Sequence, residues 1–242
     1  MRRLNVSNGS LSHLAFYVEV LLKLDELDVP YVIIGGFAAS MFGTTRVTLD
    51  IDIVVALEEK HIQALAASFP SPPYYADPNQ MRNAMEKGMT FNIIDGSRGE
   101  KVDLFPITMD ERYRPALDHR LRRRLEPTGV EPFNVWVARP EDVVIGKLMA
   151  WQEGRSTRQS DDIYEMMLFH FLQHPVVDSF DYEYVARRAA ETGEDAMALW
   201  HLKPEFQSSV STPLIPSTRA SPNRTAVTRR IRSAGPTADT RM

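Results

Sequence analysis

Two segments of this 242-residue chain carry its clearest structural signals: VPYVIIGG at residues 29–36 and DIDIVV at residues 50–55. The apolar run before the glycine pair predicts a short buried strand, and the alternation of β-branched residues with acids in the second segment predicts another. A brief helix is predicted at residues 37–42, and a loop connects it to the second strand. The order strand, Gly-Gly, helix, loop, strand indicates an α+β fold.

Helices and a β-hairpin are predicted on both sides of these segments. Apolar residues at helical spacing predict helices at residues 11–27, 58–69 and 77–87. A turn at residues 95–99 joins two apolar runs into a predicted hairpin of residues 90–94 and 101–105. From residue 139 the pattern is helical only, with helices predicted at 139–152, 158–172, 178–191 and 194–202.

These patterns divide the chain into three predicted parts. Residues 1–138 are expected to form an α+β domain, and residues 139–206 a helical subdomain. Residues 207–242 are rich in Ser, Thr, Pro and Arg, with six arginines against one acid, Asp239. Such a segment cannot bury enough apolar surface to offset the entropy of ordering it, so we expect a disordered basic tail.

The overall composition excludes several classes of protein. The formal charge of -4 is not that of a wholesale nucleic-acid binder. The absence of cysteine excludes a disulfide framework, thiol catalysis and cysteine-ligated zinc. No apolar run approaches the ~20 residues of a membrane span, and the N-terminal residues lack a signal-peptide core. We expect a cytoplasmic protein with no membrane partner.

Three acids are placed where a metal ion could be bound. Asp50 and Asp52 are separated by one residue on the second predicted strand, so they point to the same face with Cα atoms ~6.5–7 Å apart. Asp103 lies between Val102 and Leu104 in another apolar strand. Neighbouring carboxylates repel one another and are costly to bury, and a divalent cation offsets this cost. The acids therefore predict a site for one or two Mg²⁺ ions, as in enzymes of phosphoryl transfer.

The glycine pair predicts a second part of the same site. Gly35 and Gly36 follow a buried strand and open a short helix, so their backbone N–H groups face outward. Such a turn suits the phosphates of a nucleoside triphosphate. An Asp-x-Asp pair or a Gly-Gly turn is a weak signal by itself, but the two together in this order are far more specific.

These residues resemble the nucleotidyltransferase superfamily of the polymerase β type. The resemblance rests on Gly35-Gly36, Asp50-Ile51-Asp52 and the later Asp103, and it extends over about residues 25–175. It is closest to small bacterial stand-alone members and to the nucleotidyltransferase-like toxins of type IV toxin–antitoxin and abortive-infection systems. It implies a mixed β-sheet flanked by helices, a glycine pair that binds phosphates and three acids that hold Mg²⁺. Many members have Gly-Ser where this chain has Gly-Gly, which leaves only backbone donors in the turn.

Three more residues are assigned to the nucleotide site. The segment RPEDVVIGKL at residues 139–148 is similar to the family's proline-acid-aspartate segment leading to a lysine, here Lys147. Lys147 lies on an apolar helix stripe, so its ammonium group either reaches solvent or points at an anion such as a phosphate. Asp162 faces inward from the next helix and is expected either to hold Lys147 or Arg158 in place for the nucleotide or to form a plain buried ion pair. Arg46 either reaches the triphosphate or is solvated.

The predicted function is Mg²⁺-dependent transfer of a nucleoside monophosphate from an NTP to an acceptor hydroxyl, with release of pyrophosphate. Asp103 is expected to help deprotonate the acceptor. The acceptor is a tRNA or other RNA, a protein or a small molecule, and the resemblance adds an antitoxin protein as a partner. Two alternatives stay open: a non-catalytic nucleotide-binding protein of the same fold, and a haloacid dehalogenase-type phosphatase, whose Asp-x-Asp-x-Val pattern residues 50–54 also fit.

A basic cluster follows the predicted site. It consists of six arginines between residues 112 and 124: Arg112, Arg114, Arg120, Arg122, Arg123 and Arg124. Such a cluster can steer an NTP or RNA toward the site. An exposed charged helix is the alternative interpretation.

Overall fold

The centre of the molecule is a mixed β-sheet. The computed structural model describes residues 12–46, 48, 50–126, 131–172 and 180–202. Within them the sheet has seven strands in the order β3-β4-β5-β2-β1-β7-β6. The strands are β1 Tyr31–Ile34, β2 Asp52–Val55, β3 Tyr74–Tyr75, β4 Phe91–Asp95, β5 Glu100–Pro106, β6 Leu121–Leu125 and β7 Phe133–Val137. The predicted α+β class with a mixed sheet is confirmed.

The strand register brings the predicted site to one edge of the sheet. β1 is antiparallel to β2, and its last residue, Ile34, pairs with Asp52, the first residue of β2. β2 is parallel to β5, with Ile53 opposite Leu104. Asp103 is therefore the neighbour of Asp52 on the adjacent strand. The glycine turn after β1 and two of the three acids thus meet at the same place.

Most of the helices lie close to where the sequence predicts them. They are α1 Ser12–Glu26, α2 Gly35–Ser40, α3 Glu59–Ser68, α4 Pro78–Lys87, α5 Arg114–Asp118, α6 Pro140–Gly154, α7 Thr157–Phe171, α8 Tyr182–Thr192 and α9 Glu194–His201. Two short 3₁₀ turns, Ile107–Met109 and Glu111–Tyr113, follow β5. α6 begins with Pro140 and has two acids in its first turn, which suits the positive end of the helix dipole.

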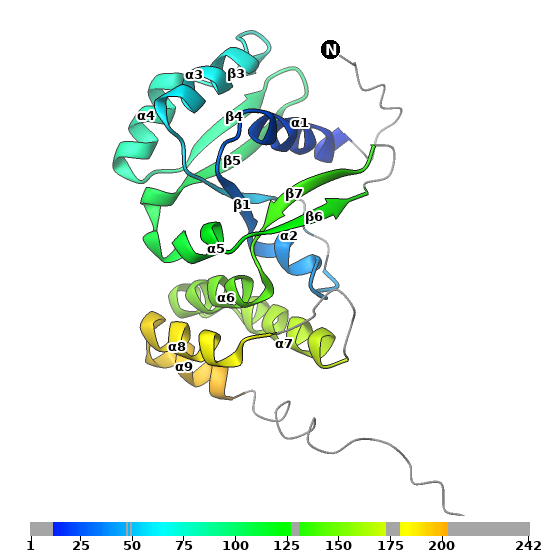
Figure 1. Cartoon of the computed structure of the whole chain (residues 1–242), viewed down its shortest axis with the longest axis vertical. Helices are drawn as coiled ribbons and strands as arrows, with labels where there is room; N and C mark the ends of the chain where they lie inside the picture. Colours follow the sequence, from blue (N-terminus) through cyan, green and yellow to red (C-terminus); the bar gives the residue numbers. More distant parts are fainter. Residues whose placement is uncertain (1–11, 47, 49, 127–130, 173–179, 203–242) are drawn as a thin grey trace, which may run out of the picture.

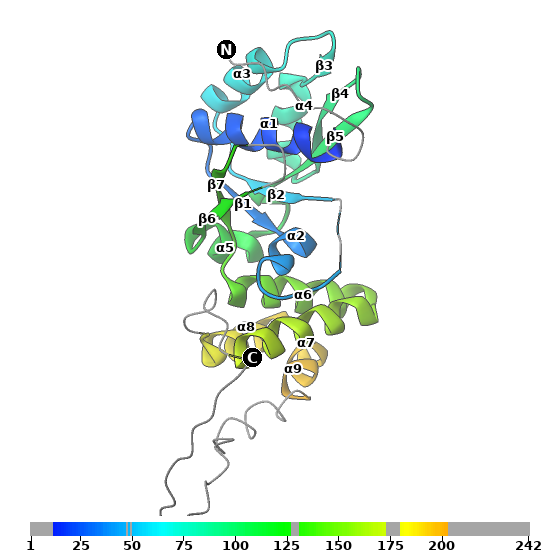
Figure 2. The ribbon, with the colours of Figure 1, turned by 90° about the vertical axis from the view of Figure 1, so that its right-hand side faces the viewer.

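The helices lie in separate groups around the sheet. Figures 1 and 2 both show α6 to α9 packed together at one end of the molecule, with α3, α4 and strand β3 of the sheet at the other end. α2 lies between the sheet and α6 (Figure 2). No helix in the described ranges has both the length and the apolar character of a membrane span.

One hydrophobic core joins the sheet to the helices. Its fully buried members include Ile33 and Ile53 in the sheet and Val144 and Leu148 in α6. The predicted boundary after residue 138 falls between β7 and α6, and the core continues across it.

The structure corrects several sequence predictions. Asp50 precedes β2 instead of lying in it, and the helix after β1 already begins at Gly35. Residues 121–125 form a strand, not a charged helix, because they pair antiparallel with β7. β3, β7 and α5 were not predicted. The predicted helix at 178–191 begins only at Tyr182 in the described residues, and the predicted tail at 207–242 lies outside them.

The arginines of the basic cluster are largely bound within the protein. Arg122 forms an ion pair with Asp25 at 2.5 Å. The guanidinium groups of Arg120 and Arg122 lie 4.7 and 4.9 Å from the ring centre of Trp136. These contacts are cation–π interactions that cover the sheet next to its edge strand.

Candidate functional site

A cavity of about 500 Å³ opens where the glycine turn after β1 faces α6. Six of the predicted site residues line it: Gly35, Gly36, Arg46, Asp50, Asp52 and Lys147. Asp103 and Asp162 do not line the cavity. Asp103 lies next to Asp52 on the adjacent strand, and Asp162 binds Lys147. Sequence segments more than 100 residues apart therefore meet at one concave surface, which is the usual form of a small-molecule site.

The glycine pair is required by two side chains that approach its backbone. Gly35 has φ +70°, and a Cβ atom there would lie 2.0 Å from Oδ2 of Asp52. A Cβ atom on Gly36 would lie 2.8 Å from Nη2 of Arg46. Any larger residue would displace one of these groups. The turn thus places an acid and a guanidinium on neighbouring parts of the same backbone.

Two carboxylates, Asp50 and Asp52, line the cavity, and a third, Asp103, lies on the strand next to Asp52. Burial raises the pKa of the half-buried Asp52, and the charges of Asp50 and Asp103 raise it further against the opposing effect of Lys147. Asp103 itself binds Lys101 at 3.0 Å. In the part of the chain that the structure describes, no three His, Cys, Asp or Glu side chains are arranged to hold a metal ion.

Nevertheless, the donor set suits a divalent cation. All three groups offer carboxylate oxygens, which Mg²⁺ prefers. The pKa of Asp52 is raised first by burial and then by the negative charge of Asp50 and Asp103. A cation bound to Asp50, Asp52 and Asp103 would balance it, and the assignment of these three acids as metal ligands stays a prediction.

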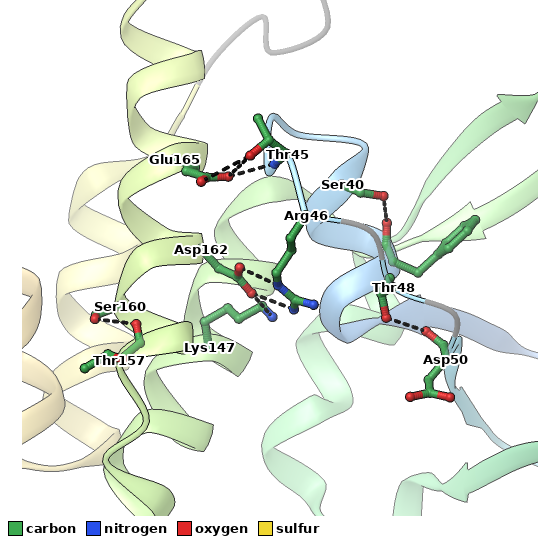
Figure 3. Close-up of polar contacts among 11 residues, drawn as sticks. Ser40, Thr45, Arg46, Thr48, Asp50, Lys147, Thr157, Ser160, Asp162 and Glu165 are labelled. Carbon is green, nitrogen blue, oxygen red and sulfur yellow. Dashed lines mark hydrogen bonds and ion pairs between the residues drawn. The ribbon is translucent and has the colours of Figure 1, made fainter.

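Asp162 joins two of the predicted cations that line the cavity, as Figure 3 shows. It accepts hydrogen bonds from Nε and Nη2 of Arg46 at 2.7 and 2.8 Å and from Nζ of Lys147 at 2.5 Å. The side chains of Asp162 and Lys147 are only 3% and 5% exposed. Asp162 thus binds Lys147, one of the two partners predicted for it, together with Arg46 instead of Arg158.

The charge balance of this cluster favours an anionic ligand in the cavity. Burial opposes ionisation of Asp162, but the hydrogen bonds from Arg46 and Lys147 outweigh it and hold the pKa of this carboxyl below its usual value. Two cations share this one carboxylate, so a positive charge remains. Arg158 adds another from the cavity wall and, within the described residues, makes no ion pair.

Glu165 is a site-forming residue that the sequence reasoning missed. Its carboxylate accepts hydrogen bonds from the backbone N–H of Thr45 at 2.7 Å and from the Thr45 hydroxyl at 3.2 Å (Figure 3). Glu165 and Asp162 are one helical turn apart on α7, so both hold the loop that carries Arg46. The spacing of these two acids was the available signal.

The haloacid dehalogenase alternative does not fit the sheet. Its Asp-x-Asp motif is expected after the first strand of a parallel sheet. Here the motif leads into β2, which is antiparallel to β1 and follows the glycine turn and α2. Asp50 also lies outside the strand.

One family model and two solved structures are similar to this chain. A family model described as "Nucleotidyltransferase of unknown function" (DUF6036) matches residues 11–199. Among solved structures, the chain is similar to an antigenic nucleotidyltransferase-like protein from Paracoccidioides brasiliensis, with 18% identity, a TM-score of 0.48 and coverage of 84% of this chain and 93% of that one. It is also similar to JHP933 from Helicobacter pylori, with 14% identity, a TM-score of 0.42 and coverage of 85% and 97%. No curated protein matches the sequence.

Proposed function

Because the chain belongs to a family of nucleotidyltransferases of unknown function, we propose that it transfers a nucleoside monophosphate from an NTP to an acceptor hydroxyl. The acceptor oxygen forms a bond to the α-phosphorus, and the bond to the bridging oxygen breaks, so that pyrophosphate leaves. The proton of the acceptor hydroxyl passes to a carboxylate of the site, for which we propose Asp103.

The observation that carries this proposal is the glycine turn held between Asp52 and Arg46 in a cavity that Lys147 and Arg158 also line. Arg46, Lys147 and Arg158 provide the charge that a triphosphate requires. Nη2 of Arg46 lies within 2.8 Å of where a side chain at residue 36 would begin. The guanidinium therefore occupies the space of the serine found in many superfamily members and offers a donor there.

Mg²⁺ is the proposed cofactor, with Asp50, Asp52 and Asp103 as its ligands. When bound, the ion would neutralise the charge that develops on the transferred phosphoryl group. The protein's own contribution is positional: Asp162 fixes Arg46 and Lys147, and Glu165 fixes the loop that bears Arg46. Fixed cations lower the barrier because they need no reorganisation during the reaction.

The test is incubation with each α-labelled NTP, Mg²⁺ and a cell extract. We expect one class of molecule to acquire label, and its identity selects among RNA, protein and small-molecule acceptors. Asp52→Asn should reduce transfer by at least about 100-fold, because it removes a charge aimed at the reacting group. Asp118→Asn, an exposed aspartate on α5 outside the cavity, is the matched control and should retain full transfer. Undiminished transfer by Asp52→Asn would contradict this mechanism.

The absence of serine from the turn also motivates a second candidate function. Residue 36 is glycine, so the turn has no hydroxyl for a phosphate. A nucleotide-binding protein without turnover would need only the cavity and its cations. Calorimetry that detects NTP binding, together with no labelled product from any extract, would favour it. A toxin–antitoxin role, an antitoxin partner and a cytoplasmic location stay predictions.

A further inference from the structure

The cavity has a second wall that differs in chemistry from the cationic one. It is formed by the end of β5, the 3₁₀ turns and one side of α6: Phe105, Met109, Tyr113, Val143, Gly146 and Met149. Two carboxylates at this side, Asp110 and Glu153, bind the same guanidinium, that of Arg112, at 2.7 and 3.1 Å. The cavity therefore has one side suited to anions and another suited to a flat apolar group.

Tyr113 is the aromatic residue of this wall that carries a polar group. Its ring lies against α6, since a Cβ atom on Gly146 would be 3.5 Å from ring atom Cε1. Burial raises the pKa of the Tyr113 phenol to about 12, so the hydroxyl is protonated at neutral pH. In the described ranges of the chain this hydroxyl makes no hydrogen bond. It is not one of the buried polar atoms left without a partner, so solvent or a ligand can reach it beside the cavity.

We propose that this apolar wall is the nucleobase subsite of the cavity and that Tyr113 is its specificity-determining residue. The inference rests on the proposed function, because it takes the cationic wall to hold the triphosphate. The nucleotide spans the cavity, with its phosphates near Lys147 and its base against the Tyr113 ring. Stacking grows with the area of the base. The site therefore prefers purine over pyrimidine nucleotides and any nucleoside triphosphate over inorganic tripolyphosphate.

The experiment compares three ligands by calorimetry in the presence of Mg²⁺: ATP, UTP and tripolyphosphate. For the wild-type chain we expect ATP to bind several-fold more tightly than UTP. Tyr113→Leu should weaken ATP binding by about tenfold and leave tripolyphosphate binding unchanged. Tyr113→Phe keeps the ring and should lose at most about fivefold, the worth of one hydrogen bond.

Two further variants calibrate the measurement. Arg158→Gln removes an exposed cation of the opposite wall and should weaken ATP and tripolyphosphate binding alike. Tyr75→Leu removes an exposed tyrosine of β3, outside the cavity, and should change neither. Unchanged tripolyphosphate binding by Tyr113→Leu also shows that this variant is folded.

The outcomes separate this inference from the proposed function. If the wild-type chain binds neither NTP nor tripolyphosphate, both fail. If it binds both but binds UTP as tightly as ATP, the base subsite is wrong and the proposed function stands. The same holds if Tyr113→Leu binds ATP as tightly as the wild type does.

Photolabelling of the unmodified protein with 8-azido-ATP gives a second test. We expect adducts within residues 105–113 or 143–153, and adducts confined to other peptides would overturn the inference.

Discussion

At the scale of single residues, Gly35 shows why its position requires glycine. Its φ of +70° costs an L-residue about 1–2 kcal/mol, and an added Cβ would also meet the Asp52 carboxylate at 2.0 Å. Gly99 has the similar φ of +68° with nothing within 4 Å. We expect Gly99→Ala to lower the free energy of unfolding by the backbone cost alone, and Gly35→Ala to lower it by more. Urea denaturation measures both, and equal losses would show that the close approach of Asp52 is unimportant.

Asp52 destabilises the fold that it serves. The pKa of Asp52 in the folded protein is raised, chiefly by burial. At a pH above this raised pKa, the ionised carboxylate is less stable in the folded protein than in the unfolded chain, which lowers the free energy of unfolding. This penalty is present at pH 7 and is relieved as the pH falls through the raised pKa toward the ordinary value near ~4.

Asp52→Asn should therefore increase the free energy of unfolding at pH 7 while it reduces activity. The increase should shrink as the pH falls through the raised pKa of Asp52, because the wild-type carboxyl then takes up a proton. Urea denaturation of both proteins over this pH range measures the difference. Loss of stability at pH 7 in the variant would contradict the raised pKa.

At the scale of elements, α7 determines the position of the loop between α2 and β2. Buried Asp162 binds Arg46 and Lys147. If its negative charge is removed, both cations lose this counter-ion. We expect Asp162→Asn to cost about 3 kcal/mol of unfolding free energy. Asp161→Asn, the adjacent exposed residue on the same helix, should stay within about 0.5 kcal/mol. Similar losses in the two variants would mean that the buried cluster contributes little.

The same cluster sets a pH dependence of opposite sign to that of Asp52. The pKa of Asp162 is lowered in the folded protein, because the bonds from Arg46 and Lys147 outweigh its burial. Asp162 therefore contributes fully to the free energy of unfolding above the ordinary carboxyl pKa near ~4, and this contribution is lost as the pH falls through the lowered pKa. The difference in free energy of unfolding between the wild type and Asp162→Asn should therefore decrease only at acidic pH, which urea denaturation over a pH series measures.

Elements with strong local signals were predictable from the sequence. β1 was predicted as the apolar run before the glycine pair, because its apolar β-branched residues end abruptly there. β6 was not, because its sequence, LRRRL, has no apolar alternation of its own and is stabilised by pairing with β7 and by contacts of Arg122 with Asp25 and Trp136. Propensity is weak where tertiary pairing determines the structure.

The candidate site was predictable to a similar extent. Residue types and spacing identified the glycine pair and the acids. The pairing of Arg46 with Asp162, 116 positions apart, leaves no trace in local sequence. The anchoring of Thr45 by Glu165 is of the same kind. Such contacts depend on how α7 packs against the loop, and only the three-dimensional structure gives that.

At the scale of the whole molecule, the sheet and the helices of residues 140–201 share one hydrophobic core. Val144 and Leu148 of α6 are completely buried in it. A core of this kind favours a single cooperative unfolding transition over independent domains. We therefore expect the two predicted parts, 1–138 and 139–206, to unfold together and a chain ending at residue 138 not to fold alone.

The three tryptophans of the chain can test this cooperativity, because Trp136 lies in β7 whereas Trp151 and Trp200 lie in α6 and α9. A variant with Trp136 alone reports on the sheet by fluorescence, while far-UV circular dichroism reports mainly on the helices. The urea midpoints of the two signals should coincide within that variant, since one core unfolds as a unit. The variant with Trp200 alone is the counterpart and should give the same coincidence. Separate midpoints in either protein would mean that the core divides at residue 138 and that the cavity lies between two independently stable parts.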